Sequence, residues 1–298
     1  MAENSVAAND FNEAPPRVTE LRRFRRVFFQ RPFVIFGLVV LLLLIFTAIF
    51  APWLAPYDPY KQNLSLALAQ PGAEHLLGTD TLGRDTLSRL IYGSRTALII
   101  GFVTVAIASF IGMTLGLLAG YFGGLTNMII MRLIDAIMPF PMILLALLIA
   151  ALLGGGIKNV IIALAVATIT PYARVMNGVA MSVKENDYIL AERAMGSTSL
   201  RVMLNHVLPN SFQPMIVMMT LQLGAVILAE ASLSFLGIGI TPPGAAWGSM
   251  VNDGYRDLLT NPALSVAPGI AIMLVVFAFN MVGDGLRDAL DPRLRGTM

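Results

Sequence analysis

The sequence predicts an all-α membrane protein with six transmembrane helices, and three observations lead to this fold class. Hydrophobic residues make up 56% of the 298 residues and charged residues only 13%, with a mean hydropathy of +0.74. Soluble domains carry about 25% charged residues. The few charges are separated by uncharged runs as long as the roughly 20 apolar residues that cross a bilayer as a helix.

The uncharged runs place the six spans. The first run, Pro32–Tyr57, has no small-residue cleavage site, so an uncleaved anchor is expected. The second span is predicted from about Thr96 to Ala119, followed by a glycine-rich turn at Gly120, Gly123 and Gly124. The others are expected at Ala136–Ile157, from Asn159 with an interruption at Pro171 and Arg174, at Phe212–Leu236, and between Asp257 and Asp284.

The distribution of basic residues predicts that both termini are cytoplasmic. With that orientation 14 of the 20 Lys and Arg residues lie inside and 6 outside. Residues 1–31 form a cytoplasmic arm, with a polar and disordered beginning, and residues 32–298 form the membrane domain. Within that domain, an outer segment is expected at about 58–95 and an inner segment at about 184–210. The basic cluster Arg22–Arg31, interleaved with phenylalanines, is equally well explained as an interfacial helix on anionic lipid and as a simple positive-inside anchor.

Several function classes are excluded by composition. A net charge of +2 is too small and diffuse for a nucleic-acid-binding protein. The chain has no cysteine, and its only histidines are His75 and His206, so neither a thiolate site nor a histidine pair for zinc is available. None of its three lysines stands in a phosphate-binding P-loop motif. No catalytic residue and no metal ligand is therefore predicted.

The predicted second span carries glycines at Gly112, Gly116 and Gly120. Small residues at every fourth position allow two helix backbones to approach closely in a membrane. General packing inside the bundle is the preferred interpretation, and a contact beside a translocation path is the alternative.

Charged residues within or beside the spans are the next candidates, because an intramembrane charge is costly and usually faces a partner or a cavity. Glu230 lies near the outer end of the fifth span, where a role in a path or an outer gate and a structural role are equally supported. Arg132 and Asp135 are spaced for an i,i+3 contact, for which a structural role is expected.

Two polar segments lie outside the spans. The outer segment Leu77–Leu98 carries Asp80, Arg84, Asp85, Arg89 and Arg95, at spacings that would let them pair on an amphipathic helix, of which a solvated surface helix is the plainer version. The inner segment Lys184–Asn210 is predicted as a helix-turn-helix. Its first helix runs to Met195, Gly196 supplies a left-handed turn, Ser197 or Ser199 caps the second helix, and Pro209 marks re-entry into the fifth span.

Five motifs in this sequence resemble the integral-membrane permeases of bacterial ABC importers, in the dipeptide/oligopeptide/nickel subfamily, and more specifically their C-type subunit. These motifs are HLLGTDTLGRDTLSRLIYGSR from His75, GLLAGYFGG from Gly116, MRLIDAIMPFP from Met131, EASLSFLGIGITPPGAAWGSM from Glu230 and FNMVGDGLRDALDPRL from Phe279. The resemblance covers nearly all of the chain from about residue 30 and implies the type I importer permease fold.

The family's cytoplasmic signature begins Glu-Ala-Ala and contains a glycine four residues later. Aligned on Gly196, the first three positions are Leu190, Ala191 and Glu192, two of which depart from the consensus. The trailing end of the signature is His206, Val207, Leu208 and Pro209. The resemblance implies that this segment is the coupling helix that contacts an ATPase subunit.

The resemblance also implies partners and a mechanism. Two ATPase subunits use ATP and Mg²⁺, and this chain is a non-catalytic permease that binds no cofactor. A second, homologous B-type permease completes the path, a periplasmic or lipid-anchored binding protein delivers the substrate, and the complex lies in the bacterial inner membrane among lipid. Peptides are the favoured substrate, with nickel, glutathione or opines as alternatives.

Two other classes of membrane protein would need different features. An ion-coupled secondary transporter needs intramembrane carboxylates or broken helices near the midplane. Within the predicted spans, only Glu230 offers a carboxylate. A membrane-embedded enzyme needs paired catalytic groups within the spans, and no such motif is found in the sequence.

Overall fold

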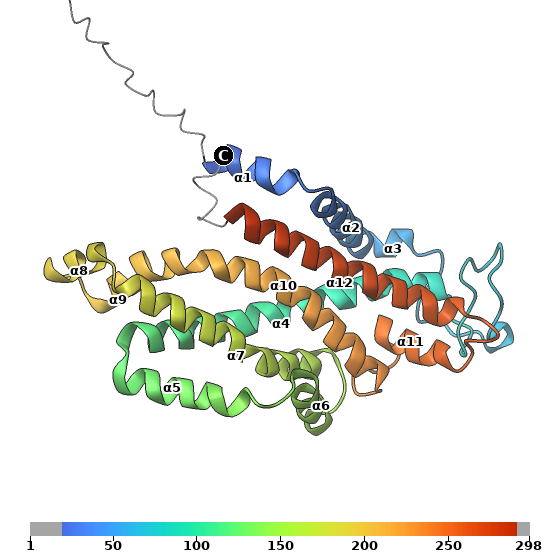
Figure 1. Ribbon diagram of the computed structural model, residues 1–298. Coiled ribbons are helices and arrows are strands. Elements are labelled where there is room, and N and C mark those ends of the chain that lie inside the picture. Colours follow the sequence, from blue (N-terminus) through green and yellow to red (C-terminus); the bar gives the residue numbers. More distant parts are fainter. Residues whose placement is uncertain (1–19, 291–298) are drawn as a thin grey trace, which may run out of the picture.

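The computed structural model describes residues 20–290, which form an elongated helical bundle and, within that range, no strand. The end that carries α8 and α9 is called the inner end, and the end that carries residues 55–85 is called the outer end (Figure 1). The expected disordered beginning of the chain lies outside the described residues.

The first helices lie on one side of the bundle. Helix α1 (Glu20–Phe29) packs its Phe28 against α2 (Pro32–Ile49) and α12 (Ala263–Leu290), while Arg22, Arg25 and Arg26 remain exposed. This amphipathic arrangement fits both interpretations of the basic cluster. The first span ends at Ile49, before the end of its uncharged run, because the chain turns there into the short α3 (Ala51–Leu54).

Helix α4 (Thr86–Phe122) begins ten residues before the predicted start of the second span, because Asp85 caps it by accepting a hydrogen bond from the Ser88 amide. The helix ends at Gly123, which has φ +66°. Gly123 and Gly124 therefore form the predicted turn, whereas Gly120 lies within the helix.

The predicted third span, Ala136–Ile157, is wrong in its start and in being a single helix. The chain instead forms α5 (Gly124–Ile137) and α6 (Met142–Leu153), bent by 85° at the break between them. Pro139 and Pro141 have no backbone N–H and cannot continue the helical hydrogen bonds, which explains the break. The predicted start at Ala136 leaves Arg132 and Asp135 just outside the span, because the spans are placed between charges, whereas both residues lie within α5.

The predicted interruption of the fourth span is also wrong, since α7 (Ile157–Lys184) passes through both Pro171 and Arg174. The charge of Arg174 is paired with Asp135, so it does not end the helix. After the inner segment, α10 (Leu208–Phe235) returns to the outer end, and α11 (Trp247–Tyr255) leads into α12. Five described helices are long and apolar enough to span a membrane, and the bent α5–α6 pair gives up to a sixth.

The glycine stripe of α4 packs against α7 of the same chain. A β-carbon at Gly112 would lie 2.7 Å from the Ile169 carbonyl oxygen, and one at Gly120 would lie 2.7 Å from the Asn177 carbonyl oxygen. At Gly116 it would overlap the Ala173 carbonyl oxygen. The backbones of α4 and α7 therefore touch along three turns, and no partner chain is needed to cover this stripe.

This packing predicts that Gly116→Ala destabilises the chain by about 1–3 kcal/mol, because the added methyl group meets rigid backbone rather than a movable side chain. The matched control is Gly269→Ala in α12, where an added β-carbon meets nothing within 4 Å. Thermal unfolding of the detergent-purified protein should show a lowered midpoint for the first variant only. Equal midpoints for the two variants would contradict the close contact.

Candidate functional site

The inner segment folds as two short helices on either side of a tight turn. Helix α8 (Asp187–Ala194) ends at Met195, and Gly196 follows with φ +86°, as the sequence predicts for a left-handed turn. Helix α9 (Ser199–Val202) is capped by Thr198, which accepts a hydrogen bond from the Arg201 amide, and not by either predicted serine. The cap lies between them because the turn uses Ser197 to bond Glu192.

The second helix does not stop before the next span. A π-helical turn, Met203–Val207, joins α9 directly to α10. Pro209, which has no backbone N–H to donate, directly follows this π-helical turn as the second residue of α10. The predicted break at Pro209 is therefore wrong, and α9 and α10 form one continuous stretch of helix.

One face of this inner segment is anchored in the bundle. Ile189, Val202 and Val207 are fully buried and join a cluster with Met176 of α7 and Met215 of α10. The Arg193 guanidinium also lies 4.9 Å from the ring centroid of Tyr121, at the inner end of α4. The segment is thus held by α4, α7 and α10 together.

The opposite face presents large apolar side chains to the outside. Leu190 is 50% exposed, Met195 74% and Leu200 61%. The turn is cross-linked by polar contacts, since Ser197 donates to Glu192 at 2.7 Å, and His206 Nε2 lies 3.6 Å from the other Glu192 carboxylate oxygen. Of the other signature positions, Ala191 and Pro209 are exposed and Leu208 is half-buried. A rigid element with an uncovered apolar face has the geometry of a docking surface.

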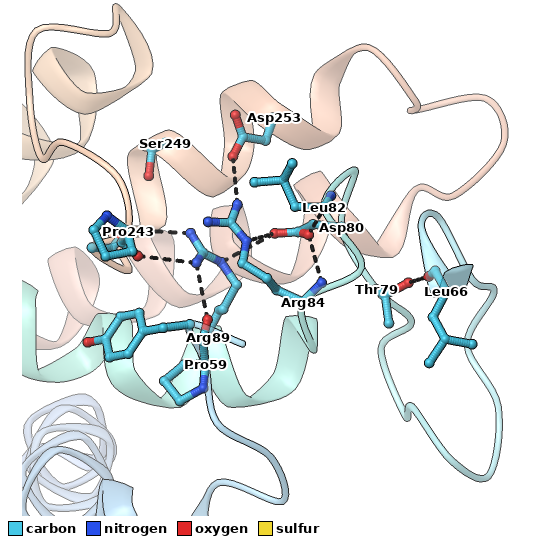
Figure 2. A network of polar contacts seen from close by, with 12 residues as sticks. Pro59, Leu66, Thr79, Asp80, Leu82, Arg84, Arg89, Pro243, Ser249 and Asp253 are labelled. Carbon is cyan, nitrogen blue, oxygen red and sulfur yellow. Dashed lines mark hydrogen bonds and ion pairs between the residues drawn. The ribbon is translucent and has the colours of Figure 1, made fainter. Parts of the chain in front are cut away.

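A buried ionic network lies at the outer end (Figure 2). Asp80 accepts hydrogen bonds from the amides of Leu82 and Arg84 and from Arg84 Nε at 2.6 Å, while Arg89 Nε lies 3.5 Å away. Arg84 and Arg89 are only 4% and 2% exposed. Asp80 and Arg84 precede α4 in a tight turn, so the expected amphipathic helix is wrong, and so is its plainer version as a solvated surface helix.

The network ties separate segments of the chain together. The Arg89 guanidinium donates to the carbonyl oxygens of Pro59, Pro243 and Gly244, and Arg84 Nη2 lies 3.9 Å from Asp253 in α11 (Figure 2). Burial raises the pKa of Asp253, against an opposing effect of the two arginines. The charges are buried together because each arginine meets several oxygens, which offsets the cost of desolvation.

A second buried cluster caps α4. His75 Nδ1 lies 2.8 Å from one carboxylate oxygen of Asp85, and the other accepts hydrogen bonds from the Ser88 amide and hydroxyl. The arrangement fixes the outer loop on the first turn of the helix. Among residues 20–290, no group of three or more histidines, aspartates and glutamates is placed to hold a metal ion.

The structure places the remaining candidates as follows. Glu230 is 2% exposed and accepts a hydrogen bond from the Ser234 hydroxyl at 2.7 Å, within its own helix α10, so its role in a path or gate stays a prediction. The ion pair of Asp135 is formed with Arg174 of α7 at 2.5 Å and not with Arg132, because α5 packs against α7 at that level. Arg132 is exposed.

Sequence reasoning missed some contacts that hold the outer end together. The Trp247 indole donates to the Leu90 carbonyl at 2.9 Å, and Asn252 donates to the Phe235 carbonyl at 2.6 Å. The residues of the first pair are 157 positions apart in sequence and those of the second 17. Only the presence of Trp and Asn in an apolar region could have singled them out, because such side chains usually find a partner when buried.

Comparison with known proteins assigns the family. The family described as "binding-protein-dependent transport system inner membrane component" matches residues 112–296, and the "N-terminal TM domain of oligopeptide transport permease C" matches residues 19–71. The chain belongs to this family of inner-membrane transport components. It is thus a multi-pass membrane protein, as predicted from the sequence.

Curated members of the family align over almost the whole chain. The dipeptide transport system permease protein DppC of Alkalihalophilus pseudofirmus is 41% identical over 95% of both chains. The di/tripeptide transport system permease protein DppC of Pseudomonas aeruginosa is 43% identical over 92% of this chain and 93% of its own. The glutathione transport system permease protein GsiD of Pectobacterium atrosepticum is 40% identical over 93% of this chain and 92% of its own.

Solved structures agree on the fold of this family member. An inward-facing structure of the MetNI methionine ABC transporter has a chain that is 18% identical, with a TM-score of 0.55 over 68% of this chain and 96% of its own. A second crystal form gives a TM-score of 0.56. The likeness confirms the type I importer permease fold that the sequence predicts.

The outer network predicts a large effect for Asp80→Ala. The substitution leaves two buried arginines without their shared carboxylate, and losing one partner of a buried pair costs about 3–5 kcal/mol. Asp253→Asn should cost much less, because burial already disfavours the charged form of this group. Thermal unfolding in detergent measures both effects.

The control for this prediction is Asp288→Asn, in the more exposed ion pair that Asp288 forms with Arg31 at 2.7 Å. Its cost should be about 1 kcal/mol or less. An Asp80→Ala variant as stable as this control would mean that the network does not hold the outer end.

Proposed function

We propose that this chain is one of two non-identical permease subunits of an ATP-driven ABC importer and forms half of a translocation path for short peptides. The observation that carries the proposal is the agreement between near-full-length similarity to di- and tripeptide permeases and an anchored inner segment with an uncovered apolar face. Glutathione is the second candidate substrate, since a relative named for its transport is 40% identical.

The ATPase subunits are the proposed partners of the inner segment. In this view Leu190, Met195 and Leu200 enter an apolar groove on an ATPase, while Ile189, Val202 and Val207 transmit its movement to the bundle. ATP and Mg²⁺ are used on those subunits, and this chain carries out no reaction and binds no cofactor. A binding protein delivers the peptide at the outer end.

The proposed orientation places both termini in the cytoplasm. Helix α1 and the last turns of α12 lie toward the same end as α8 and α9 (Figure 1), and Arg31 bonds Asp288 at that end. The excess of basic residues on that side supports the same orientation. In this proposal, residues 1–31 form a cytoplasmic arm and residues 32–298 form the membrane domain.

The whole proposal is tested by reconstitution. Co-expressed with its neighbouring permease, ATPases and binding protein, the chain should co-purify as a complex that imports di- and tripeptides into proteoliposomes. Uptake should require both ATP and the binding protein, because neither energy nor delivery comes from this chain. Peptide uptake that follows an ion gradient without ATP would instead indicate a secondary transporter.

The docking surface is tested at Gly196. Gly196→Leu should weaken ATPase co-purification and uncouple ATP hydrolysis from uptake. Its backbone has φ +86°, which costs a residue such as leucine about 1–2 kcal/mol, and the side chain would also hold the two surfaces apart. Gly196→Asn is the matched control, since asparagine tolerates this conformation. Glu192→Ala, which removes a charge at the edge of the surface, should do less than Gly196→Leu.

Membrane insertion should be normal in all three variants, because an added β-carbon at Gly196 meets no other atom within 4 Å in this chain. Normal ATPase binding and normal coupling in Gly196→Leu would place the docking surface elsewhere.

A further inference from the structure

One ion pair of the bundle is half exposed although it lies deep within the spans. Arg174 Nη2 of α7 donates to Asp135 Oδ1 of α5 at 2.5 Å, and the two side chains are 45% and 46% exposed. By contrast, the arginines of the outer network are almost completely buried. This pair therefore faces something outside the chain.

The depth of the pair follows from helix geometry. Asp135 lies eleven residues after the start of α5 at Gly124, and Arg174 ten residues before the end of α7 at Lys184. At 1.5 Å per residue both are about 15–17 Å from the inner ends of their helices. The two ends lie near each other, since a β-carbon at Gly123 would lie 3.5 Å from the side-chain nitrogen Nζ of Lys184. Helix α7 has 28 residues and is about 42 Å long, more than the roughly 30 Å of a bilayer core, and Arg174 is within about 5 Å of its midpoint, so the pair lies within the core.

Hydrocarbon is a poor environment for this surface. Placing arginine or aspartate in the centre of a bilayer costs about 2.5–3.5 kcal/mol per residue even on insertion scales. The irregular backbone between α5 and α6 follows Asp135 directly, and its flanking residues Met138 and Phe140 are more than half exposed. Non-helical backbone at this depth is tolerated only inside protein or beside a water-filled cavity. Two independent features thus show that this face does not lie against lipid, and the proposed path between the two permeases is the water-filled space it would line.

The same face has free hydrogen-bonding capacity. A recess of about 270 Å³ is lined by Asp135, Arg174, Asn177, Gly178 and Met131. Of the five guanidinium N–H groups of Arg174, one is used on Asp135, which is its ion-pair partner within residues 20–290. The buried amide nitrogen of Asn177 has no hydrogen-bond partner in that part of the chain. The recess therefore offers donors beside one carboxylate.

We propose that Asp135 and Arg174 form a binding station for zwitterionic peptides within the translocation path. Arg174, with Asn177 beside it, binds the C-terminal carboxylate through the paired hydrogen bonds that a guanidinium makes with a carboxylate. Asp135 binds the N-terminal ammonium group. Without peptide the two side chains neutralise each other, and a peptide replaces this one contact with two. The inference rests on the proposed peptide function and adds the residues that hold the peptide.

The experiment uses the absence of native cysteine in this chain. A thiol is introduced by Gly178→Cys, at a position in the recess where an added β-carbon meets nothing within 4 Å. Gly269→Cys in α12 is the matched control, with equally open space outside the recess. The complete permease–ATPase complex is placed in lipid nanodiscs without binding protein. Labelling of this chain by a charged methanethiosulfonate reagent is then followed at increasing concentrations of a dipeptide.

The Gly178→Cys thiol should react with the charged reagent, and the dipeptide should slow that reaction but not the reaction of Gly269→Cys. Adding Arg174→Gln should raise the half-protecting concentration about tenfold or more, as expected for the loss of a charge-assisted hydrogen bond. A C-terminally amidated dipeptide should protect less well than the free acid, and Arg174→Gln should abolish this difference. A purely structural ion pair would leave the difference unchanged.

The two proposals fail in different ways. If the reconstituted complex imports no peptide, the proposed function is wrong. If it imports peptides but the Gly178→Cys thiol does not react, the recess is covered by lipid or by another chain. If the thiol reacts but protection by peptide is the same with and without Arg174→Gln, the ion pair is structural. Either of the last two results overturns this inference alone.

Discussion

The structure depends on one constraint, which is that hydrocarbon cannot accept or donate a hydrogen bond. Every backbone amide and every charge within the spans must therefore be satisfied by the protein or by enclosed water. Long helices meet this demand for the backbone, and close helix contact must then come from packing, since apolar side chains gain little by leaving lipid. The stripe Gly112, Gly116 and Gly120 provides that contact, because it allows α4 and α7 to touch backbone to backbone.

The same constraint explains where the charges lie. At the outer end Asp80 is shared between Arg84 and Arg89, and the latter also meets three carbonyl oxygens, so each of these buried charges has several partners. Glu230 is bonded within its own helix to Ser234. The Asp135–Arg174 pair differs, since it is deep and yet half exposed. The burial and the partners of each charged side chain thus indicate whether protein or water surrounds it.

Much of the fold could be predicted because lipid imposes length and apolarity on a helix. The number of spans, the close contact of a glycine stripe and the left-handed turn at Gly196 all follow from local sequence. The boundaries failed where a charge was taken to end a span. Arg174 lies inside α7 because its partner comes from α5, 39 residues away, and no local pattern reveals that partner.

In the candidate site, too, local features could be predicted from the sequence, whereas features that depend on contacts between segments could not. Leu190, Gly196 and His206 could be placed on the inner segment from a motif, because a tight turn and an amphipathic face are local properties. The cap at Thr198 and the π-helical turn through His206 could not, since Ser197, Thr198 and Ser199 are all acceptable caps and the choice is made by the contact between Ser197 and Glu192. Outside the helices, Asp80 and Arg84 were given helical spacing, but a turn that returns to its own amides satisfies Asp80 more completely.

The paired helices α4 and α7 connect the two ends of the molecule. The outer end of α4 begins at Asp85 and carries Arg89, which binds the loop before α11, and its inner end carries Tyr121 against Arg193 of α8. Helix α7 runs alongside and leads directly into α8. Because the glycine contacts leave no room between their backbones, α4 and α7 are packed as one unit along this stretch. The inner segment and the outer network are therefore connected by continuous contacts along this pair of helices, and Arg174 of the Asp135–Arg174 ion pair lies on α7 between them.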